Sequence, residues 1–308
     1  MDSLRQIDLI IDSLLEKTTN ITMIKRIAIL VAMEEECAAI NKALDLVQLP
    51  KDSVLAKALF PIIVHSNKKE TVFSIWNGVS SAWQSAKHED DHKEAKDLKI
   101  KLQRVGTQAA AISCWECIKR LDPDVIVNSG TCGGITSVHK HADKTQVLPQ
   151  VKQVYFGDKV YYHDRRIPLP PWNKGWDVGA YQCLATPKLI QYINAKASQG
   201  VQLAHITTGN AFDHTLQELE AWKKYKTVLK EMECAAIAEV CAEFKKPLIA
   251  IKGVTDIVDK EDTAPDPLVN QAEINAQFIT NLLHTCQNTA NVTKLTVDFV
   301  LNKQISDL

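Results

Sequence analysis

The chain has 308 residues, 45% of them hydrophobic, and a formal net charge of -1. This length allows one large α/β domain, and the near-neutral charge excludes the broad cationic surface that attracts nucleic acids and anionic membranes. No apolar run approaches the roughly 20 residues that span a bilayer, and the acidic first residues are unlike a signal or transit peptide. Eight scattered cysteines are typical of reduced, buried thiols, so we expect a cytoplasmic protein.

The first residues predict a peripheral helix followed by a strand and a second helix. Residues 1–22 are amphipathic and are expected to form a helical extension. Residues 25–31 are a predicted strand. Residues 32–36 then turn into a helix that runs to about Leu44, because three acids in a first turn suit the positive end of the helix dipole.

A hairpin and a charged insertion come next. Residues 61–65 and 71–76 are predicted strands joined by the polar turn 66–69. Residues 81–101 carry many charges and little apolar periodicity, which indicates a solvated insertion. Beyond the insertion we predict helices over 106–121, 186–197 and from 215, and strands over 125–128, 157–162 and 203–207.

A glycine-rich stretch, SGTCGG, follows the predicted strand 125–128. It lacks the spacing of a dinucleotide-binding loop and of a Walker loop. Its small residues allow the backbone to approach a ligand, and its amides and the Thr131 hydroxyl could hold one.

Residues 231–259 predict a helix, a short loop and a buried strand. Apolar residues recur at helical spacing from Cys234 to Phe244, and Pro247 ends the helix. Residues 248–251 have the character of an interior parallel strand. Glu233 lies at the helix start and Asp256 just past the carboxyl end of the strand, where open α/β sheets bind ligands.

Strands alternate with helices along most of the chain, which predicts an α/β fold with a largely parallel sheet covered on both faces. The chain then continues with a helix over about 268–287 and an amphipathic segment to residue 308. We see neither a repeat nor a linker. We therefore expect one domain over 23–308, with an extension at 1–22 and an insertion at about 81–103.

Two short motifs could bind metal or carry redox chemistry, and both are weak. His88 and His92 complete an HExxH pattern, but it lies in a charge run without an apolar helix face, and His139 and His141 are no better placed. Cys114 and Cys117 form a CxxC inside a predicted helix, away from the N-terminus where a reactive pair belongs. We expect no metal site and structural thiols.

Five motifs occur in an order that resembles one enzyme family. They are AMEEE (32–36), SGTCGG (129–134), TGNAFD (208–213), KEMECAAIA (230–238) and IKGVTDIVD (251–259). In this order they resemble the 5′-methylthioadenosine/S-adenosylhomocysteine nucleosidases of the nucleoside phosphorylase superfamily. HDRRIPLP (163–170) and the terminal ISDL are similar to the plant-type branch. The resemblance implies a three-layer αβα sandwich with a mixed, largely parallel sheet. It also implies a homodimer that acts on a small nucleoside without metal or organic cofactor.

The resemblance assigns the chemistry to three carboxylates. Glu36 matches the general base that activates the attacking water. Asp256 matches the general acid that donates to N7 of the adenine. Glu233 matches the residue that holds the ribose hydroxyls.

Further positions match the family's substrate contacts. Met232 would lie under the sugar and Phe212 would stack on the purine. The remaining lining positions are Met33, Thr131 and Thr255. Lys252 is also matched to the substrate, although many bacterial relatives have arginine there. Ile167 and Leu169 match positions that reach the alkylthio pocket of a neighbouring subunit.

These residue types suit cleavage of an N-glycosidic bond on chemical grounds as well. Such cleavage produces an oxocarbenium-like sugar and an adenine anion, so protonation of the leaving base lowers the barrier. An aspartate can donate that proton near neutral pH when its surroundings raise its pKa. A carboxylate on the other face takes a proton from water, and one on the ribose hydroxyls favours the developing positive charge.

Two other functions remain open from the sequence. A phosphorylase of the same superfamily would need cations near the anomeric carbon to hold phosphate, whereas the loop after the first strand offers acids. Arg165 and Arg166 match a loop and not a phosphate cradle. A non-catalytic purine-binding or storage-type relative would keep the fold but lose the acid or the base, and all three carboxylates are present here.

Overall fold

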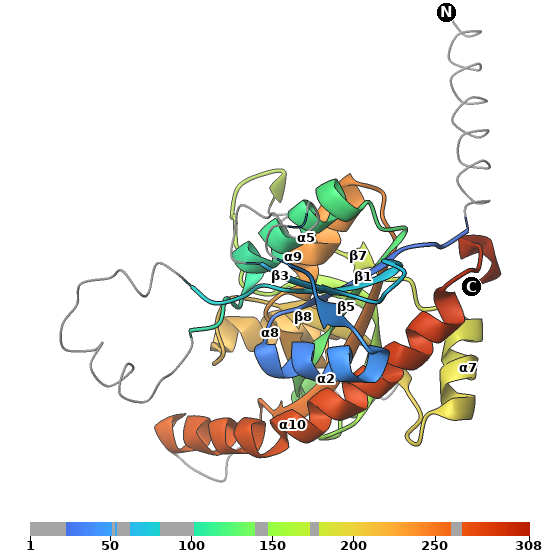
Figure 1. The fold of residues 1–308 in the computed structure, drawn as a ribbon. Coiled ribbons are helices and arrows are strands. Elements are labelled where there is room, and N and C mark those ends of the chain that lie inside the picture. The colour runs from blue at the N-terminus through green and yellow to red at the C-terminus, as the bar shows by residue number, and fades with distance from the viewer. Residues whose placement is uncertain are drawn as a thin grey trace, which may run out of the picture.

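The computed structural model describes residues 23–50, 53, 62–80, 102–138, 147–172, 179–259 and 267–308. A mixed β-sheet forms the centre of this part of the chain (Figure 1). Its strands are β1 (Ile27–Val31), β2 (Val47–Gln48), β3 (Ile63–Ser66), β4 (Val72–Trp76), β5 (Val125–Gly134), β6 (Val154–Tyr162), β7 (Tyr181–Gln182), β8 (Gln202–Thr208), β9 (Leu229–Glu231) and β10 (Leu248–Ile257).

The strand order is β10-β6-β8-β9-β5-β1-β4-β3-β2, with β7 beside β6. Parallel pairings join β1 to β4 and β5, β5 to β10, and β8 to β6 and β9. Because β10 also pairs with β5, strands β5, β10, β6, β8 and β9 close into a ring. This ring brings the ends of β5, β9 and β10 together, although they are far apart in the chain.

Helices cover both faces of the sheet, as Figure 1 shows. One layer contains α5 (Thr107–Leu121) and α9 (Cys234–Glu243), and the other contains α2 (Glu34–Leu44), α7 (Pro187–Lys196) and α10 (Pro267–Val300). Helix α8 (Leu216–Tyr225) buries Trp222 in the first layer, and a short 3-10 turn (Ile305–Asp307) follows α10. The three-layer αβα sandwich expected from the sequence is confirmed. Among the described helices, none is both long and apolar enough to cross a membrane.

Local sequence signals explain where several of these helices begin. Thr215 caps α8 by accepting a hydrogen bond from the amide of Glu218, whose side chain accepts from the amide of Thr215 in return. Thr186 accepts from the amide of Leu189 at the start of α7. Three glutamates occupy the first turn of α2, as predicted.

The structure corrects three boundaries predicted from the sequence. The stretch SGTCGG does not follow the strand but forms the second half of β5, in which Gly133 and Gly134 pair with β9 and β10. Asp256 lies inside β10, just after a register shift, and not beyond the end of the strand. Helix α10 is one continuous helix of 34 residues where we predicted two segments.

Some predictions fall outside the described residues. These are the extension 1–22, the insertion 81–101 with its HExxH pattern, and the histidines at 139 and 141. The two flanks of the insertion are described, and they join through an antiparallel bridge between Val79 and Gln103. The CxxC cysteines, Cys114 and Cys117, are buried in the interior of α5, as expected for structural thiols.

Candidate active site

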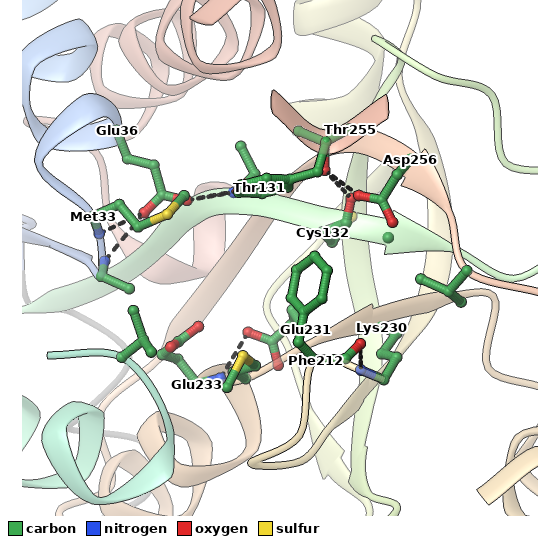
Figure 2. A pocket seen from close by; sticks show the side chains of 16 residues that line it. Met33, Glu36, Thr131, Cys132, Phe212, Lys230, Glu231, Glu233, Thr255 and Asp256 are labelled. Carbon is green, nitrogen blue, oxygen red and sulfur yellow. Dashed lines mark hydrogen bonds between the residues drawn. The ribbon is translucent and has the colours of Figure 1, made fainter. Parts of the chain in front are cut away.

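A cavity of about 260 Å³ opens where β1, β5, β9 and β10 come together (Figure 2). Eight of the nine site residues predicted from the sequence line it, namely Met33, Glu36, Thr131, Phe212, Met232, Glu233, Thr255 and Asp256. In the view of Figure 2, Glu36 and Asp256 lie on either side of Thr131, and Glu233 lies across the cavity from them. The fold therefore brings the three carboxylates to one site.

Glu36 is held by four hydrogen-bond donors. One carboxylate oxygen accepts from the amide and hydroxyl of Thr131 at 2.7 and 3.0 Å. The other accepts from the amides of Ala32 and Met33 at 3.2 and 3.0 Å. An ionised carboxylate only accepts hydrogen bonds, so this arrangement satisfies the charged form of Glu36.

Asp256 has a very different environment. Its Oδ1 accepts from the Thr255 hydroxyl at 2.7 Å, whereas its Oδ2 is buried without a hydrogen-bond partner among the described residues. The side chain is 2% exposed, and burial raises its pKa from 3.8 to about 6, against the opposing effects of the Thr255 hydrogen bond and the Lys230 charge. Asp256 is thus a carboxyl group that can hold a proton close to neutral pH.

Glu233 begins α9 and points into the same cavity. One of its oxygens accepts from the amide of Gly106 at 2.7 Å, at the start of α5. Burial, and after it the neighbouring Glu231 charge, raise the pKa of Glu233, while Lys252 opposes them. The packing of α5 against α9 therefore places a carboxyl group on one side of the cavity.

At two positions of SGTCGG in β5, only glycine leaves room for a neighbouring carboxyl group. A Cβ atom at Gly130 would lie 2.8 Å from the Glu36 Oε1 atom. A Cβ atom at Gly133 would overlap Val258 and lie 3.2 Å from the Asp256 Oδ2 atom. The strand thus makes room for one carboxyl group at each glycine.

An aromatic pair and a lysine form the remaining wall. The rings of Phe212 and Phe278 meet edge to face, with centroids 5.5 Å apart. Lys230 donates to the carbonyls of Ala211 and Phe212 at 2.6 and 2.8 Å, so it holds the loop that carries Phe212. Burial lowers the pKa of Lys230.

Lys252 is the one predicted site residue that does not line the cavity. Its ammonium is 2.8 Å from the Glu231 carboxylate, and the two side chains are 2% and 1% exposed. Burial disfavours the charged lysine, but the neighbouring acidic groups, Glu231 first among them, together outweigh it and the pKa of Lys252 is raised. Lys252 thus lies next to the cavity, paired with Glu231 of the lining, and its contact with the substrate stays a prediction.

Comparisons with known proteins agree with this geometry. A family model described as the phosphorylase superfamily matches residues 26–288. A 5′-methylthioadenosine/S-adenosylhomocysteine nucleosidase of Arabidopsis thaliana is 34% identical over 214 residues, which cover 69% of this chain and 74% of that protein. The chain belongs to this nucleosidase family.

Other relatives carry related names. A 5′-methylthioadenosine nucleosidase of Arabidopsis thaliana is 29% identical over 213 residues, or 69% of this chain and 70% of that protein. The solved structure of an Arabidopsis thaliana 5′-methylthioadenosine nucleosidase, in its apo form, superposes with a TM-score of 0.74 at 25% identity. It covers 93% of this chain and 100% of that chain.

In this member of the nucleosidase family, the two arginines considered as phosphate-binding groups lie outside the cavity. Arg165 pairs with Glu239 of α9 at 2.7 Å, and its guanidinium stacks on the Tyr162 ring at 3.6 Å. Neither arginine of this loop lines the cavity. Within the described part of the chain, no group of three or more His, Cys, Asp or Glu side chains is arranged to hold a metal ion.

Reasoning from sequence missed several residues that line the cavity. Lys230 and Glu231 belong to the KEMEC motif, in which we singled out only Met232 and Glu233. Val105, Cys132, Val258 and Phe278 were also missed. The alternation of β9 could have indicated Lys230, because residues two apart in a strand face the same side. Phe278 on α10 gave no such signal, because its place depends on how α10 crosses the sheet.

Proposed function

We propose that this chain hydrolyses the N-glycosidic bond of 5′-methylthioadenosine, and that of S-adenosylhomocysteine, to release adenine and the 5-thioribose product. The observation that carries the proposal is the meeting of Glu36, Glu233 and Asp256 around one cavity. Their environments differ, as acid and base catalysis on a single substrate requires.

Asp256 is the proposed general acid. Asp256 lines the cavity and its buried Oδ2 has no hydrogen-bond partner among the described residues, so we propose that a proton held on this carboxyl group passes to N7 of a bound adenine. Burial keeps its pKa at about 6, which leaves a useful protonated fraction near neutral pH. Protonated adenine leaves as a neutral base, and the bond to the sugar breaks.

Glu36 is the proposed general base. Three of its four hydrogen-bond donors are backbone amides, which cannot turn away, whereas the fourth is the Thr131 hydroxyl. Rotation of that hydroxyl leaves a lone pair of Glu36 for a water molecule. Glu36 then takes a proton from the water as its oxygen attacks the oxocarbenium-like sugar.

Glu233 and the aromatic wall are proposed to orient the substrate. Glu233 accepts hydrogen bonds from the ribose hydroxyls, and its negative charge favours the positive charge that develops on the sugar. Met232 lies under the sugar and Phe212 stacks on the purine. Met33, Thr131 and Thr255 line the rest of the site.

Water suits this site better than phosphate does. The catalytic wall carries Glu36 and Glu233, whose negative charges repel an anionic nucleophile. Lys230 lines the cavity, but its ammonium already donates hydrogen bonds to two backbone carbonyl oxygens and is less available to a phosphate. A neutral water molecule meets no such repulsion.

Adenine release from both thionucleosides, with and without phosphate, tests the proposal. We expect release from 5′-methylthioadenosine in phosphate-free buffer, at a rate that added phosphate does not increase. Turnover that requires phosphate would make the chain a phosphorylase. Purine binding without release under either condition would make it a non-catalytic relative.

We further propose that the chain acts as a cytoplasmic homodimer in methionine salvage. Ile167 and Leu169 are 42% and 63% exposed on the loop after β6, and we propose that they contact a second copy. The extension 1–22 and the insertion at about 81–103 are proposed to be peripheral to this nucleosidase domain. Light scattering at several protein concentrations tests the dimer, and a monomer at all of them would contradict it.

A further inference from the structure

The first turn of α9 is held by a side chain from the preceding strand. The residue that begins α9, Glu233, makes no capping hydrogen bond with its own side chain. Instead, Glu231 accepts from the amides of Glu233 at 3.0 Å and of Cys234 at 2.9 Å. The next amide, that of Ala235, donates to the Thr208 hydroxyl at 2.9 Å, and that hydroxyl donates to Glu231. Glu231 therefore satisfies the free backbone amides at the buried start of the helix, directly and through Thr208.

Lys252 makes this arrangement possible. Glu231 and Lys252 are 1% and 2% exposed, and a carboxylate buried to this extent is costly unless a cation accompanies it. Lys252 supplies the cation from β10 at 2.8 Å. Its charge also favours the ionised form of Glu233, which the Glu231 charge opposes.

We propose that Glu231 and Lys252 are positioning residues that hold Glu233 in place for the ribose hydroxyls. Glu233 is fixed at two points, its amide by Glu231 and its carboxylate by the amide of Gly106. Loss of the first point turns the helix end and moves the carboxylate. The inference rests on the proposed role of Glu233 as the ribose anchor, but not on which bond the enzyme breaks.

The test measures the ratio of two affinities, for a nucleoside with ribose hydroxyls and for one without them. A general loss of protein stability would not change this ratio. The ligands are 5′-methylthioadenosine, its 2′,3′-dideoxy counterpart and adenine, titrated by calorimetry. Each protein also carries Asp256→Asn, which is expected to slow consumption of the ligand at least about 10²-fold. The variants are Lys252→Met, Lys252→Arg, Glu231→Gln and the neutral pair Lys252→Met with Glu231→Gln.

We expect Lys252→Met and Glu231→Gln to lose at least about tenfold of the preference for the ribose, since each leaves a buried charge unpaired. Adenine affinity should change less than about twofold, because Glu233 is proposed to contact the sugar and not the base. Lys252→Arg should keep the preference, and the neutral pair should recover most of it. These two variants carry the test if a single substitution prevents folding.

A second ion pair on α9 provides the control. Arg165 and Glu239 are 2.7 Å apart and each 39% exposed, so Arg165→Met with Glu239→Gln removes a pair from the same helix far from its first turn. That control should leave the ribose preference unchanged. An unchanged preference in folded Lys252→Met, or an equal loss in the control, would overturn the inference. Absence of adenine release by the wild-type chain would instead overturn the proposed hydrolysis, and the binding result would still decide this inference.

Discussion

Asp256 and Glu36 differ in the number of donors that face each carboxyl group. Four donors meet Glu36, whereas Asp256 Oδ2 meets none among the described residues. Two carboxyl groups in one cavity can therefore hold opposite protonation states, which is what a paired acid and base require.

The pH dependence of activity should reflect the proton on Asp256. Activity requires protonated Asp256, with a pKa of about 6, and ionised Glu233, whose pKa burial raises to about 7, so kcat/KM should be greatest between about pH 6 and 7 and should fall at higher pH as Asp256 loses its proton. A pH profile of adenine release measures this decline. The alkaline decline should be absent from the residual activity of Asp256→Asn, and its persistence there would assign it to another group.

The same burial should make Asp256 destabilising when it is ionised. Its folded-state pKa of about 6 lies above the ordinary 3.8, so the fold loses stability as the pH rises through this window. The full effect, above pH 6, is on the order of 3 kcal/mol by the relation between pKa and free energy. Urea unfolding should show Asp256→Asn to be more stable than the wild type at pH 8, with the difference shrinking toward pH 4.

Asp122 provides a control of opposite sign for the stability measurement. Its hydrogen bond and ion pair with Lys246 lower the pKa of Asp122, and its left-handed backbone also suits asparagine. Asp122→Asn should therefore lose a little stability at pH 8 and not gain any. A stability difference for Asp256→Asn that does not change with pH would contradict the account.

At the scale of elements, β5 positions both catalytic carboxyl groups through its glycines. The strand could not be recognised in full from the sequence, because SGTCGG has the composition of a loop and its pairing with β9 and β10 is not local. Helices with regular apolar spacing, such as α9, were predicted closely, because their signal lies within the segment itself.

Gly130→Ala should impair turnover more than it impairs folding. The added methyl group would lie 2.8 Å from Glu36 Oε1 and push the carboxylate away from Thr131. We expect a loss of roughly 10- to 100-fold in kcat, since displacements of about 1 Å have such effects. Gly200→Ala is the matched control, because its new methyl group meets its nearest atom, of Asn194, at an ordinary 3.6 Å. Equal kcat values for the two variants would contradict the role of Gly130.

At the scale of the molecule, the closed ring of five strands brings the site together. Glu36 follows β1, Glu233 follows β9 and Asp256 lies in β10, and β5 touches both β1 and β10. Motifs in a known order could assign these carboxylates from the sequence. The ion pair of Lys252 with Glu231 could not be predicted in this way, because it depends on how two strands approach each other.

The most direct test of the central claim is the turnover number of Asp256→Asn on 5′-methylthioadenosine in phosphate-free buffer. Circular dichroism and thermal unfolding first establish that the variant is folded. The account predicts a loss of at least about 10²-fold relative to the wild type, the low end for general acid catalysis, and a similar loss for Glu36→Gln. Near-normal turnover by folded Asp256→Asn would contradict it.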